Sequence, residues 1–177
     1  MNTATKNLEN DHVHILQLID VMENATQTDD PNVEDLEVMI NIIKKYADGL
    51  HHAKEENLLF PLMTNRGFLS EQGPIAVMLH EHDLGRNYVK GMTENLEKYK
   101  GGDKKSISTV FENMLGYCEL LRGHIHKENN ILFKMADNAL TADDQQSLLK
   151  QFEQIETDGK LNDFLEQLKE LNKIYKP

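Results

Sequence analysis

The feature that most constrains the fold of this chain is an apolar stripe that recurs with helical spacing along four long segments. The clearest stripe lies in the segment 104–136, where inward positions follow one another at steps of three or four residues: Ile107, Val110/Phe111, Met114, Tyr117, Leu121, His124, Glu128, Ile131 and Met135. Such spacing places the side chains on one face of an α-helix. Stripes of the same kind predict helices over about 8–25, 33–64 and 75–99.

The connections between these segments predict how the helices are arranged. They are about 4–10 residues long, which is typical of antiparallel neighbours in a bundle. Pro74 suits the first turn of the third helix, and the pair Gly101-Gly102 suits its end. The chain is rich in helix-forming residues, and alternation of β-branched residues is hard to find. We therefore predict an all-α protein, an up-down-up-down four-helix bundle with one or two additional C-terminal helices.

The predicted bundle occupies residues 1–140, and residues 141–177 form a C-terminal helical extension. Thr141 with Asp144 three residues later resembles a capping box, which predicts a helix start. Apolar residues then recur with helical spacing, with an interruption at Asp158-Gly159. We expect the extension to pack on the bundle, with a lid or a dimer contact as the alternative.

Charge and composition limit the classes of partner. The formal net charge of −11 opposes binding to phosphate backbones, so nucleic acid is not expected as a partner. No apolar run approaches the roughly 20 residues of a membrane span, and the N-terminal residues have no secretory pattern. Cys118, as a single cysteine, has no internal disulfide partner and is interpreted as a small core residue. These features predict a cytoplasmic protein.

An internal repeat divides the chain into two similar helical hairpins. The ten residues from His51 to Phe60 realign on the ten from His124 to Phe133, and His, Lys, Glu, Asn, Leu and Phe recur in register. Asp11-His12 and Glu81-His82 form a second, weaker pair. Each hairpin therefore supplies one helix with an acidic residue beside a histidine and one helix with a His-x-x-x-Glu motif.

These motifs predict a metal site inside the bundle. Residues four apart lie on the same helix face, so His51 with Glu55 and His124 with Glu128 can reach a common centre from two helices. A buried ionised carboxylate is costly unless it is paired or bound to a metal, and both glutamates lie on apolar stripes. The predicted metal-ligating residues are His12, His51, Glu55, His82, His124 and Glu128.

The donor set indicates which metals the site would take. Imidazole nitrogen together with carboxylate oxygen suits iron, zinc and manganese. The simplest assembly gives each of two ions two histidines and lets both glutamates bridge them. That arrangement leaves positions for an oxo or hydroxo bridge and for an exogenous ligand, and we expect two iron ions.

The remaining histidines and one tyrosine require separate interpretation. His14, His80 and His126 lie two residues from a predicted ligand, about 200° round the helix, and should face elsewhere. His52, next to His51, is either a fifth histidine ligand or a residue that supports the ligands. Tyr117 is either a core residue or a pocket hydroxyl that could hydrogen-bond a bound small molecule.

At these residues the sequence resembles the hemerythrin-like family, the HHE cation-binding proteins. The resemblance covers about residues 8–136 and rests on Asp11-His12, His51-x-x-x-Glu55, Leu59-Phe60-Pro61, Glu81-His82-Asp83, His124-x-x-x-Glu128 and Leu132-Phe133. It implies a four-helix bundle with a non-haem di-iron centre, and it implies ligand roles for the six residues named above.

The sequence departs from the oxygen-carrying members of that family. Those proteins have a fifth histidine four residues from the third-helix ligand, where this chain has Met78 and Arg86. They also use an aspartate five residues after the last histidine, whereas Glu128 follows His124 by four. The set of four histidines and two glutamates is closer to that of the iron-centre repair proteins, which are linked to nitrosative and oxidative stress.

Other metal folds fit less well. A ferritin-like site needs a Glu-x-x-His element on each of two helices, and Glu9 with His12 is the single pair with that spacing. A zincin needs His-Glu-x-x-His, which does not occur in this sequence.

The sequence-based functional hypothesis is a non-haem di-iron protein that binds or reacts with a small oxidant, namely oxygen, peroxide or nitric oxide. A redox partner or an iron acceptor is implied, and no turnover reaction is assigned. One alternative is a module that stores, donates or senses iron. The other is a protein-interaction module in which the metal only stabilises the bundle.

Overall fold

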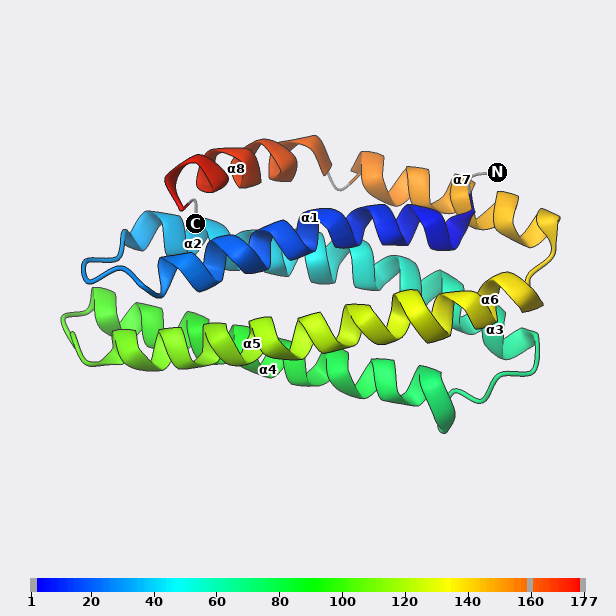
Figure 1. Ribbon diagram of the computed structural model, residues 1–177, viewed down its shortest axis with the longest axis horizontal. Helices are drawn as coiled ribbons and strands as arrows, with labels where there is room; N and C mark the ends of the chain where they lie inside the picture. Colours follow the sequence, from blue (N-terminus) through cyan, green and yellow to red (C-terminus); the bar gives the residue numbers. More distant parts are fainter. Residues whose placement is uncertain (1–2, 159–160, 176–177) are drawn as a thin grey trace.

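The computed structural model describes residues 3–158 and 161–175, and these residues form helices without a strand. Four long helices run antiparallel in chain order, which confirms the predicted all-α, up-down-up-down bundle (Figure 1). The bundle is built, in chain order, from α1 (Ala4–Ala25), α2 (Val33–Ile42), η1 (Ile43–His52), η2 (Glu55–Leu59), α3 (Phe60–Asn65), α4 (Gly73–Lys100), α5 (Ser106–Lys127), η3 (Glu128–Leu132) and α6 (Phe133–Ala139). No described helix is both long enough and apolar enough to pass through a membrane.

The second and fourth bundle helices each contain π-helical turns, the segments η1, η2 and η3. The backbone amide of Phe60 donates to the carbonyl of Glu55, five residues back, and the amide of Phe133 donates to that of Glu128 in the same way. A wide turn of this kind therefore begins at the glutamate of each His-x-x-x-Glu motif. Such π-turns are rare and are often found at functional sites.

The π-turns explain one error of the sequence analysis. The predicted stripe continued through Ile131, but that side chain is 51% exposed and its neighbour Leu132 is buried. In the second bundle helix Leu59 is likewise buried, whereas Leu58 is only half-buried. A π-turn holds one residue more than an α-turn, so the residues after it are displaced round the helix axis by about 100°. The apolar stripe therefore shifts by one residue after each glutamate.

Side chains cap the starts of three described helices, and at α2 the Asn32 side chain accepts a hydrogen bond from the Asp35 amide. α1 begins at Ala4, earlier than predicted, because the Thr3 hydroxyl accepts a hydrogen bond from the amide of Lys6. Before the helix α7 (Ala142–Asp158), Thr141 Oγ1 accepts from the Asp144 amide and the Asp144 carboxylate accepts from the Thr141 amide. The predicted capping box is confirmed.

Two additional helices, α7 and α8 (Leu161–Ile174), lie along α1 (Figure 1), and α8 also contacts α2. Phe152 of α7 is fully buried in an apolar cluster that includes Leu8 of α1. Leu168 and Leu171 of α8 belong to the larger apolar cluster of the bundle. The two helices therefore pack against α1 and α2, while Gly159 of the predicted interruption lies outside the described residues.

The core of the bundle is divided into two apolar clusters by a layer of polar residues. On α1, for example, Leu8 belongs to one cluster and Ile15 to the other, and His12 lies between them. The other three bundle helices follow the same plan. The buried polar residues of this layer are Asp11, His12, His51, His52, Lys54, Glu55, His82, His124 and Glu128.

Candidate metal centre

All six predicted ligand residues meet in the polar layer, from four different helices. His12 Nε2 lies 3.0 Å from His51 Nε2, and His82 Nε2 lies 3.1 Å from His124 Nε2. We call these pairs, with the residues around them, the His12–His51 half and the His82–His124 half of the centre. Each half takes one histidine from each member of a helix pair, so the internal repeat becomes a repeated arrangement in space.

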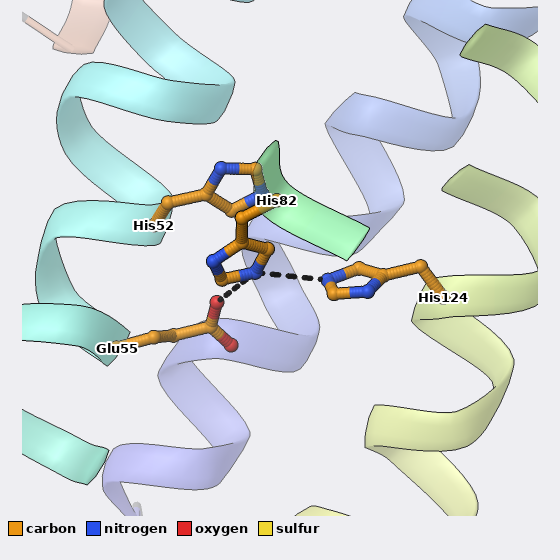
Figure 2. A group of neighbouring side chains, drawn as sticks. All are labelled: His52, Glu55, His82 and His124. Carbon is orange, nitrogen blue, oxygen red and sulfur yellow. Dashed lines mark hydrogen bonds and ion pairs between the residues drawn. The ribbon is translucent and has the colours of Figure 1, made fainter. Parts of the chain in front are cut away.

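Glu55 and Glu128 lie between the two halves. Glu128 places Oε2 3.1 Å from His12 Nε2 and Oε1 3.2 Å from His124 Nε2. Glu55 places Oε1 3.7 Å from His51 Nε2 and Oε2 3.5 Å from His82 Nε2. Figure 2 shows the Glu55 carboxylate aimed at His82. Each carboxylate therefore presents one oxygen to each half.

The far side of every histidine ring faces an oxygen that can accept a hydrogen bond. A neutral imidazole that donates from Nδ1 has its lone pair on Nε2, which here faces the centre. The four Nδ1 contacts are His12 to Asn129 at 2.7 Å, His51 to Asp11 at 3.3 Å, His82 to Glu56 at 2.6 Å and His124 to Glu81 at 2.9 Å. The rings are thus held in the tautomer that a metal ligand requires.

The polar atoms of the centre are better satisfied with bound cations than without them. With Nδ1 as the donor, two Nε2 lone pairs face each other in each half and cannot hydrogen-bond. All four carboxylate oxygens of Glu55 and Glu128 are buried and accept no hydrogen bond among the described residues. Unsatisfied buried carboxylates are costly, and a cation between them removes that cost. Two groups of four side chains can each hold an ion: His12, His51, Glu55 and Glu128, and His52, Glu55, His82 and His124.

Burial and neighbouring charges shift the titration of these residues. Burial lowers the pKa of His51 to about 4, and burial together with the Glu128 carboxylate raises the pKa of Glu55. Burial acts in the same sense on Glu128, but His124 and His12 outweigh it and lower its pKa. For His124, burial is outweighed by Glu128 and Glu81, and the pKa is raised. His51 therefore favours the neutral form, whereas His124 is paired with two carboxylates and favours the charged form.

His52 joins the His82–His124 half. Its ring stacks on the His82 ring with 3.8 Å between centroids, and its Nδ1 lies 3.2 Å from Asp48 Oδ1 (Figure 2). Burial, with the neighbouring His82, lowers the pKa of His52 to about 3. The position equivalent to His52 in the repeat is Ile125, so the His12–His51 half has no matching ring.

The other predicted residues take separate places. His80 and His126 are exposed and His14 is half-buried, all outside the centre as expected. Cys118 is a buried free cysteine whose pKa burial raises to about 12, which agrees with a core residue. Tyr117 is buried beside the centre and lines a pocket together with His52, His82 and His124.

Sequence reasoning missed a lysine–carboxylate pair behind each half. The Lys54 ammonium lies 2.8 Å from Asp11 Oδ2, and Asp11 contacts His51 Nδ1. In the other half Lys127 pairs with Glu81, which contacts His124 Nδ1. The signal was present in the sequence, because both lysines and both acidic residues align in the internal repeat.

Comparison with known proteins agrees with this site. Residues 3–136 match the family of hemerythrin HHE cation binding domains. Curated relatives are named iron-sulfur cluster repair protein YtfE: one from Yersinia pestis (strain Pestoides F) is 39% identical over 90 residues, and one from Pectobacterium carotovorum subsp. carotovorum (strain PC1) is 35% identical over 89. Each alignment spans 49% of this chain but only 40% of the relative's length. No solved structure gives a significant match.

Proposed function

This chain belongs to the hemerythrin HHE cation binding domain family, and from that premise we propose that it holds two iron ions and binds or reacts with a small oxidant: oxygen, peroxide or nitric oxide. His12 and His51 would hold one ion, and His82 and His124 the other. Glu55 and Glu128 would serve both. The observation that carries the proposal is that each of these buried, otherwise unsatisfied carboxylates presents one oxygen to each histidine pair.

The side chains around the ligands would prepare the site for this chemistry. Asp11, Glu56 and Glu81 hold the Nδ1 atoms of three histidines, which keeps the rings oriented and makes them more basic ligands. The apolar clusters on both sides of the polar layer exclude water from the centre. Iron, when bound, would supply the electrons exchanged with the oxidant. His52 would be a fifth nitrogen donor, and the Tyr117 hydroxyl would hydrogen-bond the small molecule.

Metal content of matched histidine variants tests the ligand assignment. We expect two iron ions per chain in protein purified without oxygen, and fewer in His124→Ala. The control is His126→Ala, an exposed histidine two residues away, which should keep the full metal content. Elemental analysis of the three proteins gives the answer. Equal iron in His124→Ala and His126→Ala would contradict the assignment.

Reactivity needs a separate experiment on the iron-loaded protein. The reduced protein is mixed anaerobically with oxygen, hydrogen peroxide or nitric oxide, and its visible absorption is recorded. A spectral change with at least one of them, weaker or absent in His82→Ala and retained in His80→Ala, supports the proposal. If the loaded protein responds to none of the three, the oxidant-binding role is wrong even though the metal site stands.

Iron donation is the second candidate function. It is favoured by the relatives, which are named iron-sulfur cluster repair proteins, although the alignment spans only 40% of their length. In this role the chain would release iron to an acceptor. Incubation of the iron-loaded protein with an apo iron–sulfur protein, followed by the acceptor's absorption spectrum, distinguishes the two roles. Retention of iron while a free chelator competes for it would argue against donation.

A further inference from the structure

A cavity of about 390 Å³ opens beside one half of the centre only. His52, His82 and His124 line its inner end, whereas neither His12 nor His51 contributes to its wall. Organic ligands occupy pockets of roughly 300–1,000 Å³, while one water-sized molecule takes about 30 Å³. The cavity is therefore much larger than oxygen, peroxide or nitric oxide requires.

The glycine at position 85 maintains this space. Gly85 lies within α4, where glycine costs about 0.5–1 kcal/mol relative to alanine. A Cβ atom there would meet the Tyr117 ring at 3.5 Å, an ordinary contact, so close packing does not require glycine. At Gly91 and Gly116 the same atom would collide with Asn113 at 2.2 Å and Tyr88 at 2.5 Å. Gly85 thus differs from these two glycines: its missing side chain enlarges the cavity.

The wall of the cavity offers an apolar surface and a free hydroxyl donor. Ile43, Val89, Leu120 and Leu121 contribute aliphatic side chains. Tyr117 is 2% exposed, lines the cavity, and its hydroxyl has no hydrogen-bond partner among the described residues. This hydroxyl is therefore free to donate a hydrogen bond to an acceptor on a ligand in the cavity.

Most charged side chains that line the cavity are paired with one another, and the remaining cation, Lys44, which has no ion-pair partner among the described residues, is exposed to solvent. Arg86 contacts Asp48 at 2.8 Å and Glu56 at 2.7 Å, and Lys90 lies 3.8 Å from Glu94. A charged ligand would have to break these pairs and enter an apolar space, which is unfavourable. The cavity therefore favours an uncharged ligand.

From these observations we propose that the cavity bounded by Gly85, Val89 and Tyr117 binds an uncharged organic molecule of about the size of a substituted benzene ring, whose carbonyl or ether oxygen accepts a hydrogen bond from the Tyr117 hydroxyl. Binding requires the cavity and not the metal. The ligand's placement beside His82 and His124 would make it a reactant of the proposed iron centre, and only that role rests on the proposed function.

A pair of probes that differ by one acceptor tests the proposal. Acetophenone and ethylbenzene have nearly the same size and shape, but only acetophenone carries a carbonyl. Saturation-transfer NMR titrations are carried out with the full chain, both metal-free and iron-loaded. We expect saturable binding of acetophenone, with a dissociation constant on the order of 0.1–1 mM for so small a ligand. Tyr117→Phe should weaken acetophenone about fivefold and leave ethylbenzene unchanged.

Glycine variants provide the matched control. Gly85→Leu should fill the cavity and weaken both probes at least tenfold. Gly123→Leu introduces the same side chain at an exposed helical glycine with open space around it, so both affinities should remain. Val89→Phe fills the cavity from the next turn of α4 and serves if Gly85→Leu does not fold.

The outcomes separate this inference from the proposed function. Loss of probe binding in Gly85→Leu or Val89→Phe but not in Gly123→Leu supports the cavity site, even if no iron is found. Probe binding that survives both cavity-filling variants overturns it, even if iron is bound and reactive. If acetophenone binds Tyr117→Phe as tightly as the unchanged protein, the proposed hydrogen bond from the Tyr117 hydroxyl to the carbonyl oxygen is wrong.

Discussion

The two halves of the centre are built on the same plan, but they meet different surroundings. In each half a lysine pairs with a carboxylate that contacts the Nδ1 atom of a histidine. The Lys54 side chain is 1% exposed, whereas the equivalent Lys127 side chain is 37% exposed. The His12–His51 half is sealed, and the His82–His124 half is open to the cavity.

The C-terminal extension and one substitution within the repeat account for the difference. Glu156 of α7 lies 2.5 Å from the Lys54 ammonium, so the extension covers the lysine of the sealed half. Three residues after its histidine, the sealed half has the buried Ile15, where the open half has Gly85. Repetition of a motif therefore supplies equivalent candidate ligands, while the side chains around them decide which half of the centre a small molecule can reach.

The largest expected effect is that of removing metal from both halves. Loss of one ion whose free concentration is about 1,000 times its dissociation constant costs about 4 kcal/mol, which for a chain of this size lowers the melting temperature by about 8–16 °C, and loss of the second ion adds to this. Chelation followed by a thermal melt measures it, and added iron should restore the midpoint. A melting curve that does not move after verified removal would contradict a metal site in either half.

The second-largest expected effect is a difference in stability between variants of the equivalent lysines, Lys54 and Lys127. Lys54→Met leaves Asp11 and Glu156 without their buried partner and should cost about 3 kcal/mol, because an unpaired buried charge is strongly destabilising. Lys127→Met removes a partly exposed ion pair and should cost less than about 1 kcal/mol. Urea unfolding of the two variants measures the difference. Equal losses of stability would show that the buried lysine of the sealed half contributes no more than the exposed lysine of the open half.

Lowering the pH should change the stability of the metal-free protein by less than Lys54→Met does. His51 and His52 have pKa values lowered to about 4 and 3. Below pH 6.5 the unfolded chain therefore binds more protons than the folded one, and the free energy of unfolding decreases as the pH is lowered. Glu55 acts in the opposite sense, because its pKa is raised. One net proton corresponds to about 1.4 kcal/mol per pH unit between pH 6.5 and 4. Urea midpoints at pH 7, 6 and 5 test this. Stability that rises as the pH falls would refute it.

The smallest expected effect concerns the cover of the sealed half. Thr141→Ala removes the cap of α7 and should cost about 1 kcal/mol. Thr157→Ala in the same helix is the control, with less than about 0.5 kcal/mol expected. Hydrogen exchange should become faster in α7 and around Lys54 but not around Lys127. Equal acceleration at both lysines would mean that α7 does not protect one half selectively.

The fold, and the meeting of the six candidate ligand side chains inside it, were accessible from the sequence, because helical periodicity is local. His-x-x-x-Glu motifs on apolar stripes showed which side chains point inward, and the repeat showed that they do so twice. The π-turns were missed, because Ile131 and Leu132 are both aliphatic and either could continue the stripe, so Ile131 was placed inward although it is exposed.

The sequence by itself determined a helical bundle with imidazoles and carboxylates directed to its interior, since periodicity and residue chemistry suffice for that. Only the tertiary structure decided which atoms face each other and which half is closed. Glu156 and Lys54, for example, are 102 residues apart in the chain. Contacts of that kind depend on how whole helices pack, which no local pattern specifies.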